Sequence, residues 1–299
     1  MQSALKVCVL NPLDIAIEIK GVSHSFEGAS GQSSPSSQEL MALETTNLEI
    51  RRGELLSLIG PSGCGKSTLL NMMGGLLTPA SGEVRVNGVQ VSAPMPKTVS
   101  FVFQENALFP WNTILDNIVV ALAFQCVPSS ERLDLAHQAL RAVGLSEFAN
   151  YYPDQLSGGM RQRAALARAL SLKTDIILMD EPFAALDEQT RMVLGEDLST
   201  LLNQTGKTIV LVTHSLGEAV FLSDRIAVIS ARPGRVLEVI EVNEPHPRNP
   251  EFVTSLKFSE LRNRLYELLH DEIRQTLSTQ AMGTPTVGPH SSLASSRHG

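Results

Sequence analysis

The sequence lacks the features that mark membrane-spanning, secreted and strongly basic proteins. None of its apolar runs approaches the roughly 18 to 20 residues needed to cross a bilayer, and the N-terminus has no signal-peptide pattern. Its three cysteines have neither metal-ligand spacing nor an even disulfide framework, which fits a reducing compartment. The formal net charge of -7 argues against binding nucleic acid through an overall basic field, although a local basic patch stays possible. We therefore expect a cytoplasmic chain that reaches a membrane only through a partner.

What the chain does contain is an alternation of strand-like and helical segments. Residues 15–26, IAIEIKGVSHSF, alternate apolar and polar side chains as a half-buried strand does. Asn87 and Gly88 lie between alternating valines in VRVNGVQV, a pattern typical of a tight β-hairpin. Further strands are expected in GELLSLI, SFVFQ, DIILMDE, KTIVLVTH and DRIAVIS. Because helical segments separate several of these strands, the pattern predicts an α/β fold built on a parallel sheet.

Changes in composition along the chain predict its division into units. A Gly/Ser/Pro stretch directly after Phe26 is typical of a flexible loop, and an amphipathic helix is expected from about Glu251 to Leu277. The expected units are an N-terminal extension (1–14), a main domain (15–240) with an inserted helical subdomain (about 106–160), a C-terminal segment (241–278) and a disordered tail (279–299).

The motif GPSGCGKS, residues 60–67, carries the strongest chemical signal. It matches G-x-x-x-x-G-K-[ST] and lies between a predicted strand and a predicted helix, the context that a phosphate-binding loop requires. The glycines let backbone N–H groups turn toward a phosphate chain, Lys66 reaches the β and γ phosphates, and Ser67 offers its hydroxyl to Mg²⁺. The chain is therefore expected to bind a nucleoside triphosphate. The expected contacts are Gly60, Pro61, Ser62, Gly63, Cys64, Gly65, Lys66, Ser67 and Thr68.

Polar residues also follow three other predicted strands. Asp180 ends an apolar strand in a position to hold Mg²⁺, and Glu181 comes next, where it can orient or deprotonate a hydrolytic water. Gln104 and His214 end two further strands. Each could be a plain polar strand end when taken alone. Because ligands in open α/β sheets gather at the carboxyl ends of parallel strands, their convergence favours one shared crevice.

A second glycine-rich turn, LSGGM, precedes the alanine-rich helix MRQRAALARAL. Ser157, Gly158 and Gly159 would form a helix N-terminus whose exposed N–H groups attract an anion. An ordinary helix cap followed by a glycine turn would explain the same residues. The motif by itself leaves both interpretations open.

The order of these motifs resembles that of the ATP-binding cassette (ABC) ATPases over about residues 15–235. The elements are GPSGCGKS, Gln104, LSGGM, LMDEP, AALD and TH. The resemblance implies a P-loop NTPase cassette with a RecA-like parallel-sheet core, an antiparallel β subdomain and an inserted α-helical subdomain. It implies ATP hydrolysis with Mg²⁺. The implied catalytic residues are Glu181, His214 and Gln104, and the implied metal-site residues are Ser67, Gln104 and Asp180.

In that family the LSGG loop completes the ATP site of a second copy in a head-to-tail dimer. By this likeness Ser157 and Gly159 would contact the γ-phosphate held by Lys66 of the other copy, and Asp187 of AALD would communicate across the interface. Phe26 looks like the aromatic residue that stacks on adenine. The chain departs from the family pattern where Ala184 replaces a frequent serine, and where the Gly/Ser insert follows Phe26.

Local phrases narrow the resemblance to importers. VFQENALFPWNT, GGMRQR and SARPGRV are similar to the importer ATPases for nitrate, sulfonates, taurine and bicarbonate. This implies a separate transmembrane permease, a periplasmic or lipoprotein substrate-binding protein reached through the permease, and a peripheral place on the cytoplasmic face of the membrane. Trp111 would lie where the permease docks, or would simply pack in the core.

Two alternative functions follow from the same motifs. A cytosolic ABC ATPase acting on nucleic acid or ribosomes would need a basic face and usually a second cassette, and both are missing from this sequence. A P-loop kinase for a small metabolite would leave LSGGM unexplained. We therefore expect the importer ATPase, with no nucleic-acid partner.

Overall fold

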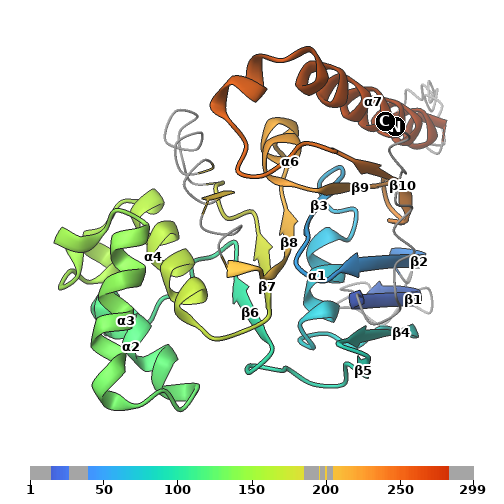
Figure 1. Cartoon of the computed structure of the whole chain (residues 1–299). Coiled ribbons are helices and arrows are strands. Elements are labelled where there is room, and N and C mark those ends of the chain that lie inside the picture. Colours follow the sequence, from blue (N-terminus) through green and yellow to red (C-terminus); the bar gives the residue numbers. More distant parts are fainter. Residues whose placement is uncertain (1–14, 27–39, 185–194, 196–198, 201–204, 283–299) are drawn as a thin grey trace, which may run out of the picture.

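A computed structural model gives the fold of the chain. It describes residues 15–26, 40–184, 195, 199–200 and 205–282. Two sheets, a group of helices on one side and a long C-terminal helix make up the described part (Figure 1). Among these residues, none of the helices is both long enough and apolar enough to cross a membrane.

The larger sheet has six strands and is mostly parallel, as the α/β pattern predicts. Its order is β10-β9-β3-β8-β7-β6, and only the edge strand β10 runs antiparallel to its neighbour. The strands are β3 (Leu55–Ile59), β6 (Val99–Val102), β7 (Ile176–Asp180), β8 (Thr208–Val212), β9 (Arg225–Ile229) and β10 (Val236–Glu241). Strands β3, β7 and β8 are almost continuously apolar because both faces of the sheet are covered.

The smaller sheet has four antiparallel strands in the order β2-β1-β4-β5. The predicted hairpin is confirmed: β4 pairs with β5 across Asn87 and Gly88, and both turn residues have positive φ, at 49° and 78°. The strands are β1 (Ile15–Phe26), β2 (Leu40–Arg51), β4 (Ser81–Val86) and β5 (Val89–Gln90). Helix α1 (Lys66–Met73) contacts both this sheet and the parallel sheet (Figure 1).

The remaining helices form two groups. Helices α2 (Ile114–Phe124), α3 (Ser129–Ala142) and α4 (Gly158–Ser171) pack on one another at the β6 side of the parallel sheet, with short 3₁₀ turns at Ser146–Phe148 and Pro153–Gln155. At the opposite edge, α7 (Leu256–Met282) packs on α6 (Leu216–Leu222) and on β9, after a 3₁₀ turn at Pro250–Thr254.

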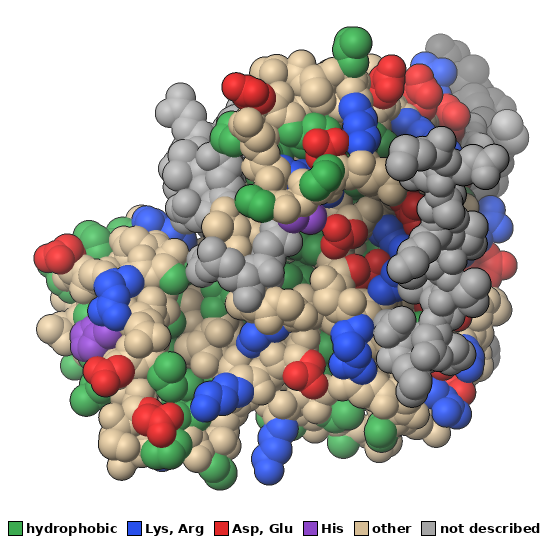
Figure 2. All heavy atoms as spheres, in the orientation of Figure 1, with side chains coloured by type: hydrophobic (Ala, Val, Ile, Leu, Met, Phe, Trp, Pro, Cys, Tyr) green, Lys and Arg blue, Asp and Glu red, His purple; other side chains and the backbone are tan. Residues whose placement is uncertain are grey.

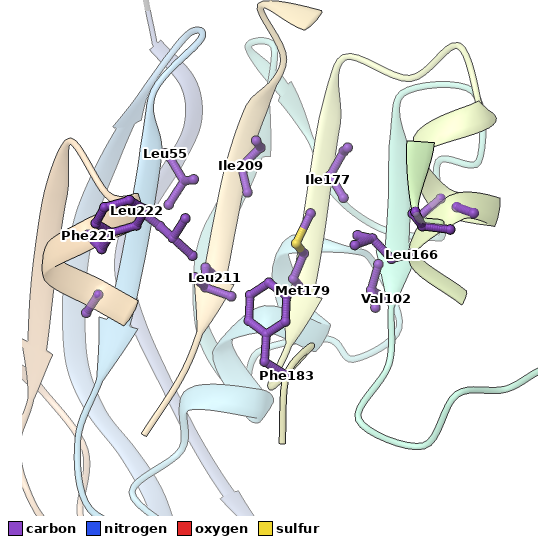
Figure 3. Close-up of a cluster of buried hydrophobic side chains, with 14 of the residues drawn as sticks. Leu55, Val102, Leu166, Ile177, Met179, Phe183, Ile209, Leu211, Phe221 and Leu222 are labelled. Carbon is purple, nitrogen blue, oxygen red and sulfur yellow. The ribbon is translucent and has the colours of Figure 1, made fainter. Parts of the chain in front are cut away.

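The core is split by the sheet into two layers. Ile177 and Met179 of β7 face the layer that contains α2 to α4 and α6, as Figure 3 shows for part of this cluster. Their neighbours Ile176 and Leu178 face the layer that contains α1 and the antiparallel sheet. This division follows from the two-residue period of a strand, and it anchors the carboxyl end of β7 from both sides.

Several predicted boundaries are corrected. Strand β6 ends at Val102, two residues before Gln104, and β8 ends two residues before His214. Strand β10 was not expected from the sequence. Gln104 and His214 therefore lie in the turns that follow β6 and β8.

The helical boundaries also differ from the expectation. The inserted helices begin at Ile114 instead of Asn106, because Pro110 and the turn around it come first. The C-terminal helix begins at Leu256 instead of Glu251 and continues through Met282, so residues 279–282, expected to be disordered, are helical. The Asn249 side chain caps the 3₁₀ turn, which takes up the predicted start of the helix.

Candidate functional site

The GPSGCGKS segment forms a tight loop between β3 and α1. Gly63 and Gly65 both have positive φ, at 73° and 97°, and Gly65 caps α1. These are conformations that glycine adopts without strain, so the loop depends on its glycines. The Lys66 side chain is buried and its Nζ donates to the carbonyl oxygens of Gly60 and Pro61, each at 2.8 Å. Lys66 is thereby held inside the curve of the loop.

A cavity of about 360 Å³ opens in front of this loop. The predicted residues that line it come from the loop and from three other strand ends, together with Phe26 of β1. Its predicted lining residues are Phe26, Ser62, Gly63, Gly65, Lys66, Ser67, Thr68, Gln104, Glu181 and His214. Leu40, Ala42 and Arg232 line it as well, although no sequence motif marks them as ligand contacts. The convergence predicted for the carboxyl edge of the sheet is therefore present.

Three of the predicted loop residues do not line this cavity. Gly60 and Pro61 receive the Lys66 hydrogen bonds through their carbonyl groups. The Cys64 side chain is buried, and burial raises the pKa of its thiol, with the nearby Lys66 charge opposing that shift. An inert, neutral thiol at this position fits a packing role.

Asp180 lies at the end of β7, directly beside the start of α1. The Ser67 hydroxyl donates to its Oδ1 at 3.1 Å. Burial raises the pKa of Asp180, while the Ser67 hydrogen bond and the Lys66 charge work in the opposite direction. A hydroxyl and a partly desolvated carboxylate in contact are oxygen donors of the kind that Mg²⁺ prefers.

Glu181 is the centre of a polar cluster at the cavity. Its Oε1 lies 2.5 Å from Nε2 of His214, and its Oε2 accepts from Nε2 of Gln104 at 3.4 Å. The Glu181 side chain is only 11% exposed, whereas the His214 side chain is 50% exposed. The three side chains come from turns after β7, β8 and β6, so the parallel sheet brings them together.

The backbone of Glu181 is held in an unusual conformation. Its φ is +49°, in a region that costs a residue other than glycine free energy. Its N–H donates to the Val212 carbonyl at 2.9 Å, and its carbonyl accepts from Nε2 of Gln162 at 2.9 Å. These two contacts, to β8 and α4, hold the carboxylate at the cavity against local strain.

Phe26 ends β1 and forms part of an apolar wall of the cavity with Leu40 and Ala42. The Phe26 side chain is 43% exposed and meets the His24 ring edge-on, with centroids 4.7 Å apart. An exposed ring beside a phosphate loop is free to stack on a flat ligand. The Gly/Ser insert after Phe26 lies outside the described residues.

Comparison with known proteins identifies the family. The ABC transporter profile matches residues 43–184. An ABC transporter ATP-binding protein from Methanocaldococcus jannaschii is 44% identical over 79% of this chain and 87% of its own length. An aliphatic sulfonates import ATP-binding protein from Bacillus cereus is 40% identical over 81% of this chain and 94% of its own. This chain belongs to the ABC transporter ATPase family.

Other members agree with this result. A bicarbonate transport ATP-binding protein from Synechococcus elongatus is 38% identical over 93% of this chain and 41% of its own length. A nitrate import ATP-binding protein from the same organism is 40% identical over 80% of this chain and 37% of its own length. A solved dimeric cassette, MJ0796 bound to ADP and phosphate, has a TM-score of 0.67 at 34% identity, covering 77% of this chain and all of that one. The cassette described here is thus an ATP-binding, ATP-hydrolysing domain, and the predicted α/β cassette fold is confirmed.

The LSGGM turn of this cassette forms the start of α4. Ser157 is its N-cap, and the Ser157 hydroxyl oxygen accepts from the Met160 N–H at 3.3 Å. Gly158 and Gly159 form the first turn, and none of the three residues lines the cavity of about 360 Å³. The structure therefore does not join the two glycine-rich segments within one chain. Asp187, the other residue implied to act between copies, lies outside the described residues.

Two residues of the helical subdomain, the exposed Trp111 and the buried Gln162, also bear on the site. Trp111 is 72% exposed, which excludes the alternative that it packs in the core. Its ring contacts Phe109, with centroids 5.6 Å apart. Gln162 of α4 bonds to the Glu181 carbonyl, which links the subdomain to the polar cluster. The sequence carried no signal for this link, because it joins residues from different elements.

Proposed function

We propose that this cassette is the ATPase subunit of an importer, and that a separate transmembrane permease moves the substrate. The permease would hold the cassette at the cytoplasmic face of the membrane, and a periplasmic or lipoprotein substrate-binding protein would deliver the substrate to it. The names of the sulfonate, bicarbonate and nitrate relatives support a small oxyanion as the substrate. Reconstitution with the permease and radiolabelled anions would identify it.

The cavity supports a role for each side chain in ATP hydrolysis. The phosphate loop would bind the triphosphate through its N–H groups and Lys66, and Phe26 would stack on the adenine ring. Ser67, Asp180 and Gln104 would hold Mg²⁺, which supplies positive charge for the phosphates when it is bound. The contact between Ser67 and Asp180 fits this assignment because both offer oxygen ligands.

Glu181 would position and deprotonate the attacking water. Its carboxylate lies within hydrogen-bond distance of two groups that themselves face the cavity, His214 and Gln104. His214 is half exposed and could reach a γ-phosphate, while Gln104 would report nucleotide binding to the helical subdomain. This cluster at the sheet edge is the observation that carries the hydrolytic assignment.

We further propose that Ser157 and Gly159 complete the ATP site of a second copy in a head-to-tail dimer. Their place at the α4 N-terminus, outside the cavity of their own chain, supports this arrangement. The N–H groups of a helix N-terminus attract phosphate, so a second copy could close the open side of the site. Asp187 would communicate across the same interface.

Mixing two inactive variants tests the proposal. Lys66→Ala removes the phosphate-binding amine and Ser157→Arg blocks the turn, so each homodimer is expected to lose hydrolysis. If the turn acts on the other copy, a mixed dimer keeps one intact composite site, and mixing should restore activity that neither variant has alone. As the control, one chain carrying both changes is mixed with wild type, and this pair should contain no intact site. Failure of mixing to restore hydrolysis, in dimers shown to exchange, would contradict the proposal.

Trp111 is the residue we propose to meet the permease. It is a large exposed side chain of the subdomain that Gln162 links to Glu181. Trp111→Ala should leave the basal ATPase rate of the isolated cassette unchanged and reduce its stimulation by the permease. Phe124→Ala is the matched control, since Phe124 is a 79% exposed aromatic residue at the end of α2. Equal loss of stimulation in both variants would exclude a specific role for Trp111.

The alternative of a nucleic-acid factor finds no support on the visible surface. Figure 2 shows acidic and basic side chains interspersed over one face of the molecule, which matches the net charge of -7. Binding that tracks phosphates needs basic residues gathered on one face.

A further inference from the structure

We infer that Arg232 is a positioning residue of the phosphate loop and a determinant of ATP affinity. Arg232 lies in the turn between β9 and β10, within the SARPGRV segment. Its Nε and Nη2 both donate to the carbonyl oxygen of Gly63, at 2.9 and 2.8 Å, across 169 residues of sequence. Arg232 also lines the nucleotide cavity. The inference rests on the phosphate-loop assignment of the proposed function.

The turn and the loop approach each other closely at Gly63 and Gly234. A Cβ atom added to Gly63 would lie 2.6 Å from Nη2 of Arg232. A Cβ atom added to Gly234 would lie 1.9 Å from the carbonyl oxygen of Cys64. The second contact is with backbone, so the close approach of the turn requires glycine at position 234. The first contact is with the end of a flexible side chain, and it is the positive φ of 73° that favours glycine at position 63. The close approach of the turn at Gly234 therefore brings the Arg232 guanidinium within reach of the Gly63 carbonyl.

The contact controls the direction of a carbonyl group in the anion site. A phosphate loop binds through N–H groups that point inward, and a carbonyl oxygen turned toward the phosphates would repel them. To turn, Gly63 would have to give up two charge-assisted hydrogen bonds. Arg232 thus favours the binding conformation of the loop, and its charge adds to that of Lys66 beside an anionic ligand.

The turn is itself anchored to the C-terminal helix and to the antiparallel sheet. The Ala231 N–H donates to Oε2 of Glu272, on α7, at 3.0 Å. The Gly234 N–H donates to the Ala42 carbonyl, and the Gly234 carbonyl accepts from the Glu44 N–H, both at 2.9 Å. Residues next to Arg232 are thus held by α7 and β2. Glu272 supports the turn that carries the guanidinium, so the C-terminal helix acts on nucleotide binding.

Arg232 is placed to affect binding more than chemistry. Its side chain donates to the loop carbonyl of Gly63, whereas the Glu181 carboxylate contacts His214 and Gln104. A loss of loop order weakens ground-state and transition-state binding together, which raises KM and leaves kcat nearly unchanged. A general loss of folded protein would lower kcat instead.

The test compares Arg232→Ala with Arg235→Ala in the full chain. Arg235 lies in the same turn and its nearest carboxylate, on Glu44, is 3.9 Å away, so its removal changes the charge without touching the phosphate loop. We expect Arg232→Ala to raise the KM for ATP about tenfold, with kcat within about twofold of wild type, because two hydrogen bonds to a charged group are lost. Arg235→Ala should change neither constant by more than about twofold.

Four further variants keep the inference open to refutation. Arg232→Lys retains the charge but not the planar fork, so it should restore part of the affinity. Glu272→Ala should also raise the KM for ATP, but by less than Arg232→Ala, and the two effects should not add in the double variant. Glu267→Ala, on the same helix, is the control and should leave KM unchanged. An unchanged KM in Arg232→Ala, or an equal rise in Arg235→Ala, would overturn the inference. Lys66→Ala tests the phosphate-loop assignment separately from the role of Arg232. Normal ATP binding by this variant would contradict the phosphate-loop assignment.

Discussion

Replacing Glu181 with glutamine should separate nucleotide binding from hydrolysis. The change keeps the shape of the side chain and removes its charge. The backbone contacts of residue 181 to Val212 and Gln162 are unaffected, since they use main-chain atoms. Glutamine also tolerates the positive φ of this position as glutamate does. We therefore expect a folded cassette with its cavity intact.

The size of the effect follows from the contacts of the carboxylate. Oε1 lies 2.5 Å from Nε2 of His214 and Oε2 lies 3.4 Å from Nε2 of Gln104. Among the described residues that line the cavity, Glu181 is the only one with a carboxylate, and the variant loses it. General base catalysis by a positioned carboxylate contributes about 10²- to 10⁴-fold. This corresponds to roughly 2.7 to 5.4 kcal/mol of transition-state stabilisation. An amide cannot accept the proton, so most of this should be lost.

Phosphate release at saturating MgATP measures this loss, and equilibrium titration with ATP measures binding. Glu181→Gln should hydrolyse ATP at least about a hundredfold more slowly and bind it as tightly as wild type. Glu83→Gln is the control, because Glu83 pairs with Arg85 on the antiparallel sheet at 2.9 Å and does not line the cavity. Turnover within about threefold of wild type would refute the role of Glu181, and lost ATP binding would mean that the variant disturbs the loop.

Three further predictions concern Asp180, the buried core and Phe26. Burial raises the pKa of Asp180, so without bound metal its ionisation lowers folding stability as pH rises above the usual aspartate pKa. Asp180→Asn should remove this loss and give a higher melting temperature at pH 7 in the presence of a chelator. A lower melting temperature would contradict the prediction. Met179→Ala should cost about 2 to 5 kcal/mol in urea unfolding because the side chain is fully buried, whereas Leu133→Ala, at 54% exposed, should cost much less. Phe26→Ala should weaken ATP binding but not inorganic triphosphate binding, and equal weakening of both would argue against adenine stacking.

Much of the site could be predicted because its parts are local. The phosphate loop needs glycines at positive φ directly before a helix, and the eight consecutive residues 60–67 supply them. Gln104, Glu181 and His214 could be placed together because carboxyl ends of parallel strands share one edge. The ends of β6 and β8 could not be predicted to the residue, since two residues of each following turn share the strand propensity.

Contacts between distant segments could not be predicted in the same way. Arg232 reaches Gly63 only because β9 pairs with β3 in one register, which sets the turn after β9 beside the loop after β3. Gln162 reaches Glu181 only because α4 packs on the sheet next to β7. Neither arginine nor glutamine stands out in its own segment, since both are ordinary residues of an exposed turn and a helix.

The sequence by itself determined the fold class, the phosphate loop and the acidic strand end, because strand periodicity, glycine conformation and helix capping act over a few residues. Tertiary structure decided the extent of α7, the exposure of Trp111 and the partners of Glu181 and Gly63. These features depend on which elements pack together and in which register. Packing free energy sums over residues far apart in the chain, so no short pattern contains it.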